Sequence, residues 1–217
     1  MKATLRHVAL LRGINVGGKN MLPMKELVKV FVAAGCGDVM TYIQSGNVVF
    51  SASAKVVEGL GSFVASRVEK QFGLRIPVVL RTAAEMEAVI RGNPFLAAGV
   101  GEEMLHVCFL ADLPDADSVA GLDAGRSAPD EFAVVGREIY MCLANGVSGT
   151  KLTNAYFDSK LKTVSTMRNW RTVLKLGEMV AGQKQATAGS GGESKAAVEK
   201  QVSPLRYSQV REQLRSK

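Results

Sequence analysis

The strongest constraint on the fold is the order of strand-like and helix-like apolar runs over residues 1–81. These runs are separated by turns rich in Gly, Asn and Pro. In order they are a strand at His7–Leu11, a helix over 23–35, strands at Val39–Ile43 and Asn47–Ser51, a helix over 56–73, and a strand at Ile76–Leu80. The β-α-β-β-α-β order is typical of a ferredoxin-like split β-α-β unit of the α+β class, with an antiparallel sheet. The first and third strands are predicted to be neighbours at the centre of that sheet.

The second half of the chain has weaker patterns of the same kind. We expect a helix at Ala83–Arg91, a strand at Met104–Ala111, a hairpin of Phe132–Val135 with Glu138–Leu143, and helices at Lys151–Leu161 and Thr172–Val180. A second, degenerate copy of the first unit, packed beside it, is the hypothesis, although no repeat is visible in the sequence. The predicted organisation is a ferredoxin-like subdomain at 1–81, a second α+β subdomain at 82–181, and a flexible basic tail at 182–217, where Gln, Ala, Gly, Ser and Lys dominate.

Composition places the chain among ordinary globular proteins. Of its 217 residues, 47% are hydrophobic and 22% are charged, so a core forms without disulfides or metals. No apolar run has the length of a membrane helix, and the first residues lead straight into a strand without a secretory leader. Three widely spaced cysteines argue against a zinc site or a disulfide scaffold. We therefore expect a cytoplasmic protein with no membrane partner, no bound metal and no cofactor.

The charge is concentrated late in the chain. Residues 1–150 carry 14 Lys and Arg against 15 Asp and Glu, whereas residues 151–175 carry six basic residues and a single acidic one. A local basic patch of this kind favours contact with an anion over general coating of nucleic acid.

The first polar motif is the Gly-rich segment Arg12–Asn20, which leaves a buried strand and leads toward a helix. Backbone N–H groups at such a place point toward an anion, and glycine lets the backbone approach closely. Its candidate ligand-binding residues are Arg12, Asn15, Gly17, Gly18, Lys19 and Asn20. The segment matches neither nucleotide-binding glycine fingerprint, and a purely structural connection is the alternative.

Two further motifs are candidates for the same site. Gln44, Ser45 and Asn47 lie in the turn before the third strand, at the end of the sheet where the first strand exits, so they are expected near Arg12. Arg168, Asn169 and Trp170 come from the most basic segment and suit an acidic or planar ligand. The alternatives are local hairpin chemistry for the turn, a helix cap for Asn169 and a core position for Trp170.

The sequence resembles a bacterial family of domains of unknown function. The resemblance rests on the motif LLRGINVGG at Leu10–Gly18, TYIQSGNVVF at Thr41–Phe50, NPF at Asn93–Phe95 and RNW-x-T at Arg168–Thr172, within about residues 4–180. It implies a ferredoxin-like α+β architecture, duplicated, and it implies no activity.

Catalytic motifs are scarce in the chain. His7 and His106 both lie in strand-like runs, and no nucleophile or metal-ligand motif is present. Whether the protein is an enzyme is left open, as is its oligomeric state. The leading hypothesis is that the three motifs bind an anionic ligand, namely a nucleotide, a phosphate-containing metabolite or a nucleic-acid segment. The alternatives are a metal-independent enzyme acting on a small anionic substrate in a cleft between the subdomains, and a structural or oligomeric scaffold.

Overall fold

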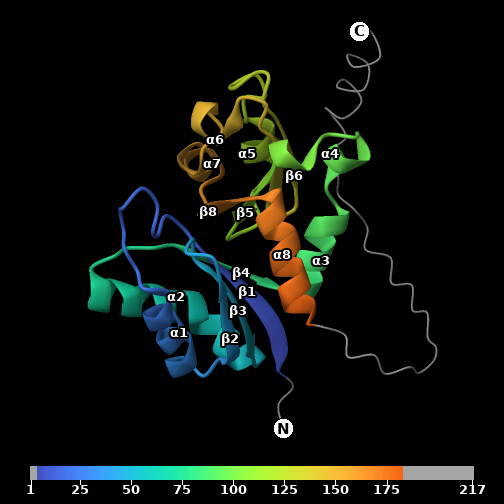
Figure 1. The fold of residues 1–217 in the computed structure, drawn as a ribbon. Helices are drawn as coiled ribbons and strands as arrows, with labels where there is room; N and C mark the ends of the chain where they lie inside the picture. The colour runs from blue at the N-terminus through green and yellow to red at the C-terminus, as the bar shows by residue number, and fades with distance from the viewer. Residues whose placement is uncertain (1–3, 183–217) are drawn as a thin grey trace, which may run out of the picture. The chain divides into compact units, whose positions relative to one another are not determined.

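The structure, a computed structural model, describes residues 4–182. The first half forms a four-stranded sheet with the strand order β2-β3-β1-β4, all pairs antiparallel (Figure 1). Its elements are β1 (Leu5–Leu11), α1 (Met24–Ala33), β2 (Gly37–Tyr42), β3 (Asn47–Ala52), α2 (Ala54–Phe72) and β4 (Val78–Thr82). The predicted central pair is confirmed, because β1 pairs with β3 from Leu5–Ala52 to Leu10–Asn47.

The second half repeats this arrangement. Its sheet has the antiparallel order β6-β7-β5-β8, which confirms the expected α+β fold with two packed units. The elements are β5 (Leu105–Leu110), α5 (Ala116–Ala120), β6 (Glu131–Val135), β7 (Glu138–Cys142), α7 (Asn154–Leu161) and β8 (Ser165–Asn169). Strand β8 was not predicted. The boundaries at 81 and 181 stay predictions, and the expected flexible tail lies, from residue 183 on, outside the described residues.

A helix follows each unit: α3 (Ala83–Arg91) after β4 and α8 (Trp170–Ala181) after β8. Both begin at a capped strand end, since the side chains of Thr82 and Asn169 each accept a hydrogen bond from a backbone N–H three residues later. Three short helical turns, α4 (Pro94–Ala97), η1 (Glu102–Met104) and α6 (Gly146–Gly149), complete the described elements. Helices α3 and α8 pack side by side (Figure 1).

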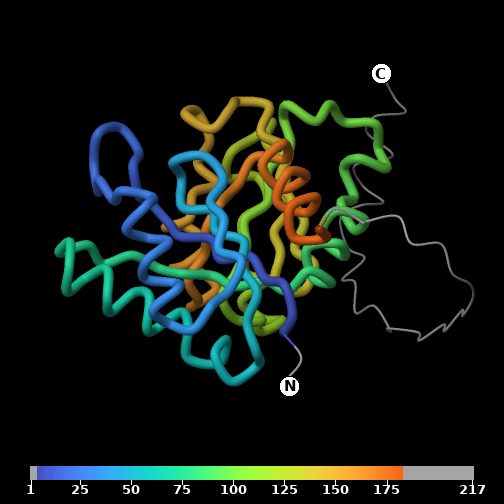
Figure 2. Tube along the Cα trace, turned by 60° about the horizontal axis from the view of Figure 1, so that its bottom comes forward, coloured from blue at the N-terminus to red at the C-terminus, as the bar shows by residue number. Residues whose placement is uncertain are grey.

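The apolar side chains form three clusters. Helices α1 and α2 cover one face of the first sheet, and α7 covers one face of the second sheet. The third cluster joins the opposite faces of both sheets to the apolar sides of α3 and α8, and includes the buried Trp170. In this cluster α8 packs against β1 and β3 of the first sheet and β5 of the second (Figure 2).

The two sheets also match in register. Val8 pairs with Arg81 in the first sheet, and Val107 pairs with Arg168 at the same position of the second sheet. An equivalent backbone hydrogen bond also fixes the end of the first strand in each unit. The Leu11 N–H donates to the Gly46 carbonyl at 2.8 Å, and the Leu110 N–H donates to the Arg137 carbonyl at 2.8 Å. By this register the counterpart of Asn47 at the start of β3 is Glu138 at the start of β7.

Candidate functional site

Arg168 connects the second unit to the polar turns of the first. Its guanidinium donates through Nε to Asn47 Oδ1 at 2.6 Å and through one terminal nitrogen to the Leu11 carbonyl at 2.7 Å. The same nitrogen donates to the Ser45 carbonyl at 3.2 Å. The second terminal nitrogen donates to Thr166 Oγ1 and to the Met167 carbonyl. Every nitrogen of this buried guanidinium is therefore used inside the protein.

Arg81 makes the reciprocal connection from the first unit to the second. It donates through Nε to Glu138 at 2.8 Å, and through a terminal nitrogen to the carbonyls of Leu110 at 2.7 Å and Arg137 at 3.0 Å. Arg81 and Arg168 occupy the same register position in their sheets. Each half therefore donates hydrogen bonds to the other half through an equivalent arginine. The two connections differ in charge, since Arg81 faces a carboxylate and Arg168 faces the neutral side-chain amide of Asn47.

Burial has the expected electrostatic consequence for both arginines. Removal from water disfavours the charged guanidinium and lowers the pKa of Arg168 to about 10. The pKa of Arg81 is also lowered by burial, against the opposing effect of the Glu138 carboxylate. Internal hydrogen-bond acceptors surround both guanidinium groups.

Arg12 is likewise engaged within the protein. Its guanidinium donates to Asp158 on α7 at 2.5 Å and to the Ser165 carbonyl at 2.9 Å. The hydroxyl of Ser165 donates to the other oxygen of the Asp158 carboxylate at 2.6 Å. This half-buried network is a second polar contact between the Gly-rich segment and the second unit.

The asparagines of the Gly-rich segment shape its loop. Asn15 adopts a positive φ of 54°, and its amide donates to the carbonyls of Leu22 and Gln44, each at 2.9 Å. Asn20 has a φ of 50° and donates to the Gly13 carbonyl at 2.7 Å. Gly17, Gly18 and Lys19 lie exposed at the loop tip. The loop does not enter α1 directly, because Leu22 is buried and Pro23 stands before the first helical residue.

The other predicted residues divide between the turn and the core. Asn47 is fully buried and donates to Ser45 Oγ at 2.9 Å and to the Tyr42 carbonyl, while the Gln44 side chain is exposed. Asn169 caps α8 through Thr172 N–H at 2.9 Å. The Trp170 indole is fully buried among apolar residues, which gives it a packing role. The structure thus links the third motif to the other two through Arg168, which donates to Asn47, to the Ser45 carbonyl and to the Leu11 carbonyl, while Lys19 and Gln44 stay exposed.

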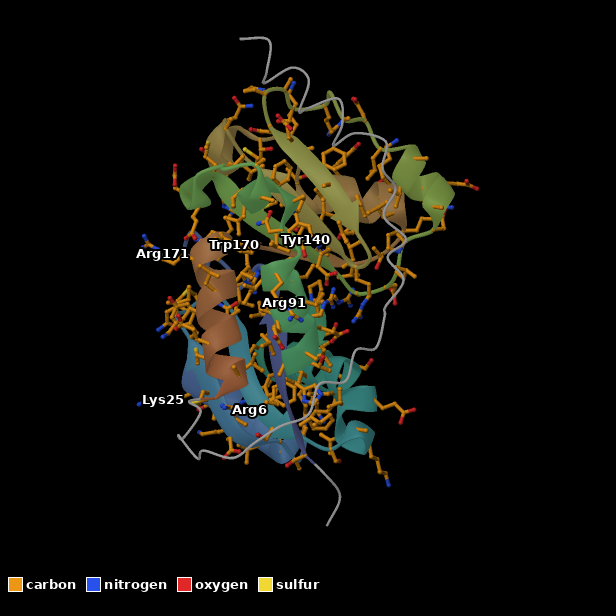
Figure 3. All side chains as sticks on the ribbon, turned by 90° about the vertical axis from the view of Figure 1, so that its right-hand side faces the viewer. Arg6, Lys25, Arg91, Tyr140, Trp170 and Arg171 are labelled. Atoms are coloured by element: carbon orange, nitrogen blue, oxygen red, sulfur yellow. The ribbon has the colours of Figure 1, made fainter. Side chains whose placement is uncertain are left out.

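A groove of about 380 Å³ opens beside two of these motifs. Its lining residues are Tyr42, Glu102, Glu103, Arg171, Leu174, Lys175 and Glu178. Tyr42 directly precedes the turn of the second motif, and Arg171 directly follows Trp170. Figure 3 shows Arg171 at the beginning of α8, pointing away from the core.

Several residues that line the groove are charged. Lys175 pairs with Glu178 at 2.9 Å, and this partner raises the pKa of the lysine. Within residues 4–182, Arg171, Glu102 and Glu103 form no ion pair, so one cation and two carboxylates line the groove unpaired. Sequence reasoning did not select Glu102, Glu103 or Lys175. The spacing of Arg171, Leu174, Lys175 and Glu178 along one helix face was the available signal.

Residues 4–182 contain neither a metal-binding cluster nor a membrane-spanning helix. Among residues 4–182 there is no group of three or more His, Cys, Asp and Glu side chains arranged to hold a metal ion. In the same part of the chain, no helix has the length and apolar character needed to cross a bilayer.

Comparison with known proteins gives a family and a structural relative. A family model described as a protein of unknown function, DUF1697, matches residues 5–140. The solved structure of the conserved bacterial protein SP0830 from Streptococcus pneumoniae is similar, with 26% sequence identity and a TM-score of 0.61. The alignment covers 82% of this chain and 99% of that protein. No functionally curated protein matches the chain.

Proposed function

The chain belongs to the DUF1697 family of proteins of unknown function, and from this starting point we propose that it binds a small anionic metabolite in the groove between Tyr42 and α8. The observation that carries the proposal is the exposed Arg171, which has no ion-pair partner within residues 4–182 and lines a groove of about 380 Å³. The anionic group of the ligand is a phosphate or a carboxylate.

The position of Arg171 on α8 favours an anion. It is the second residue of a 12-residue helix, where the helix dipole attracts negative charge. Lys175 lies one turn further along on the same face, but its charge is paired with Glu178 at 2.9 Å, so Arg171 is the cation that a ligand would meet. Guanidinium groups bind phosphate and carboxylate through two parallel hydrogen bonds, which gives direction as well as affinity.

Two carboxylates in the lining of the groove restrict the class of ligand. Glu102 and Glu103 would repel a ligand that is anionic throughout, whereas they accept hydrogen bonds from an amine or hydroxyl. Tyr42 and Leu174 add apolar surface to the lining. The groove therefore favours a metabolite with an anionic group at one end and an amine or several hydroxyls at the other.

A matched pair of probes tests this proposal. Phosphoethanolamine and ethyl phosphate differ chiefly in the amine, so calorimetric titration of the full chain should give tighter binding for phosphoethanolamine. Arg171→Ala should weaken both probes by roughly ten- to a hundredfold, the effect of losing a charge-assisted hydrogen bond. Glu102→Gln should reduce the preference for the amine without weakening ethyl phosphate.

Arg75→Ala is the control, because Arg75 is exposed and, among residues 4–182, forms an ion pair with Glu69 alone. It should leave both affinities and the melting temperature nearly unchanged. If neither probe raises the melting temperature of the wild-type chain, or if Arg171→Ala and Arg75→Ala behave alike, the groove is not the binding site.

A further inference from the structure

The loops that follow the first strand of each unit occupy equivalent places and carry opposite charges. After β1, residues 12–25 contain Arg12, Lys19 and Lys25 and no acidic residue. After β5, residues 111–117 contain Asp112, Asp115 and Asp117 and no basic residue. We call the first segment, which includes the first two residues of α1, the basic loop, and the second, which includes the first two residues of α5, the acidic loop. Figure 2 shows the basic loop in blue, extending away from the packed strands.

Both loops also expose large apolar side chains. In the basic loop Val16 is 62% exposed and Met21 is 66% exposed, and in the acidic loop Leu113 is 71% exposed. Exposed apolar residues surrounded by charge of one sign are typical of a surface that is covered by a partner. Lys19, Lys25 and Asp117 form no ion pair within residues 4–182, so their charges are available for such a partner.

We propose that the occupant of the basic loop is the acidic loop of a second copy of this chain. The charges of the two loops are complementary, and each places apolar side chains among them. In a two-fold dimer the contact occurs twice, because each copy presents one basic and one acidic loop. The loops share no residue with the groove at Arg171, so a test of the dimer does not depend on whether the groove binds a ligand.

Charge-reversal variants, measured separately and as a mixture, test this arrangement. Sedimentation velocity of the full chain should show a monomer–dimer equilibrium that weakens as salt is raised. Lys19→Glu and Asp117→Lys should each weaken dimerisation by at least about tenfold, since each places like charges in both contacts. An equimolar mixture of the two variants should dimerise like the wild type, because each mixed contact again joins opposite charges.

The control pair is Lys70→Glu and Glu58→Lys, two exposed positions on α2. Neither variant should change the dimerisation constant, and their mixture should show no recovery. Leu113→Ser should weaken the dimer without altering its salt dependence, because it removes apolar contact only. A chain that is monomeric at all concentrations, or a dimer insensitive to both loop reversals, overturns the proposal.

Discussion

Among single residues, Arg168 has the most consequential environment. A buried guanidinium with all nitrogens bonded internally stabilises the fold, because its removal leaves acceptors such as Asn47 Oδ1 and the Leu11 carbonyl without donors. We expect Arg168→Met to lower the free energy of unfolding by at least about 2–3 kcal/mol in urea titrations. Arg168→Lys should recover little, since lysine lacks the planar fork that reaches several acceptors at once.

The surface variant Arg75→Met sets the baseline for this measurement. Its ion pair with Glu69 is exposed, and its loss should change stability by less than about 1 kcal/mol. Equal stability of the Arg168 and Arg75 variants would contradict a structural role for Arg168.

At the scale of elements, the turn between β2 and β3 depends on one glycine. Gly46 has a φ of +77°, and a Cβ at this position would lie 2.8 Å from Leu11 Cβ and 3.0 Å from the Leu11 carbonyl oxygen. Gly46→Ala should therefore destabilise the protein by more than about 2 kcal/mol in urea titrations. Gly17 also has a positive φ, of +57°, but a Cβ at this position would meet open space. Gly17→Ala should therefore lower the free energy of unfolding only by the backbone strain, about 1 kcal/mol. Equal losses for the two variants would exclude steric contact with Leu11 as the cause.

Local patterns predicted most elements but not their long-range bonds. The order of apolar runs was enough for β1, β3 and their pairing, because strand spacing and turn residues are local signals. Strand β8 was missed because Ser165–Asn169 is polar, with Met167 as its only apolar residue. Sheet topology predicted that the Gly-rich segment and the turn before β3 lie at the same end of neighbouring strands, whereas Arg168 was assigned to this site only because its segment is the most basic one. The burial of Arg168 was not predicted, because its bond to Asn47 joins residues 121 positions apart.

For the whole molecule, the shared core predicts cooperative unfolding. Residues of both sheets, α3 and α8 form one apolar cluster, and Arg81 and Arg168 bond across the halves. Trp170 fluorescence and far-ultraviolet circular dichroism should therefore report a single urea transition with one midpoint. A fragment of residues 1–81 should fail to fold alone, because it exposes the apolar face formed by Val8, Leu10 and Val49. Two separate transitions, or a folded fragment, would mean that the halves are independent.

The position of α8 also has a consequence for synthesis on the ribosome. This helix ends at Ala181, yet it packs against β1 and β3, which are among the first segments to be translated. Until α8 has left the exit tunnel, the nascent first sheet has one apolar face without its cover, a state prone to aggregation. We therefore expect the first half to complete its folding only after α8 has emerged, and not as an independent unit during translation. A chaperone that covers this apolar face of the nascent sheet should then raise the yield of folded protein.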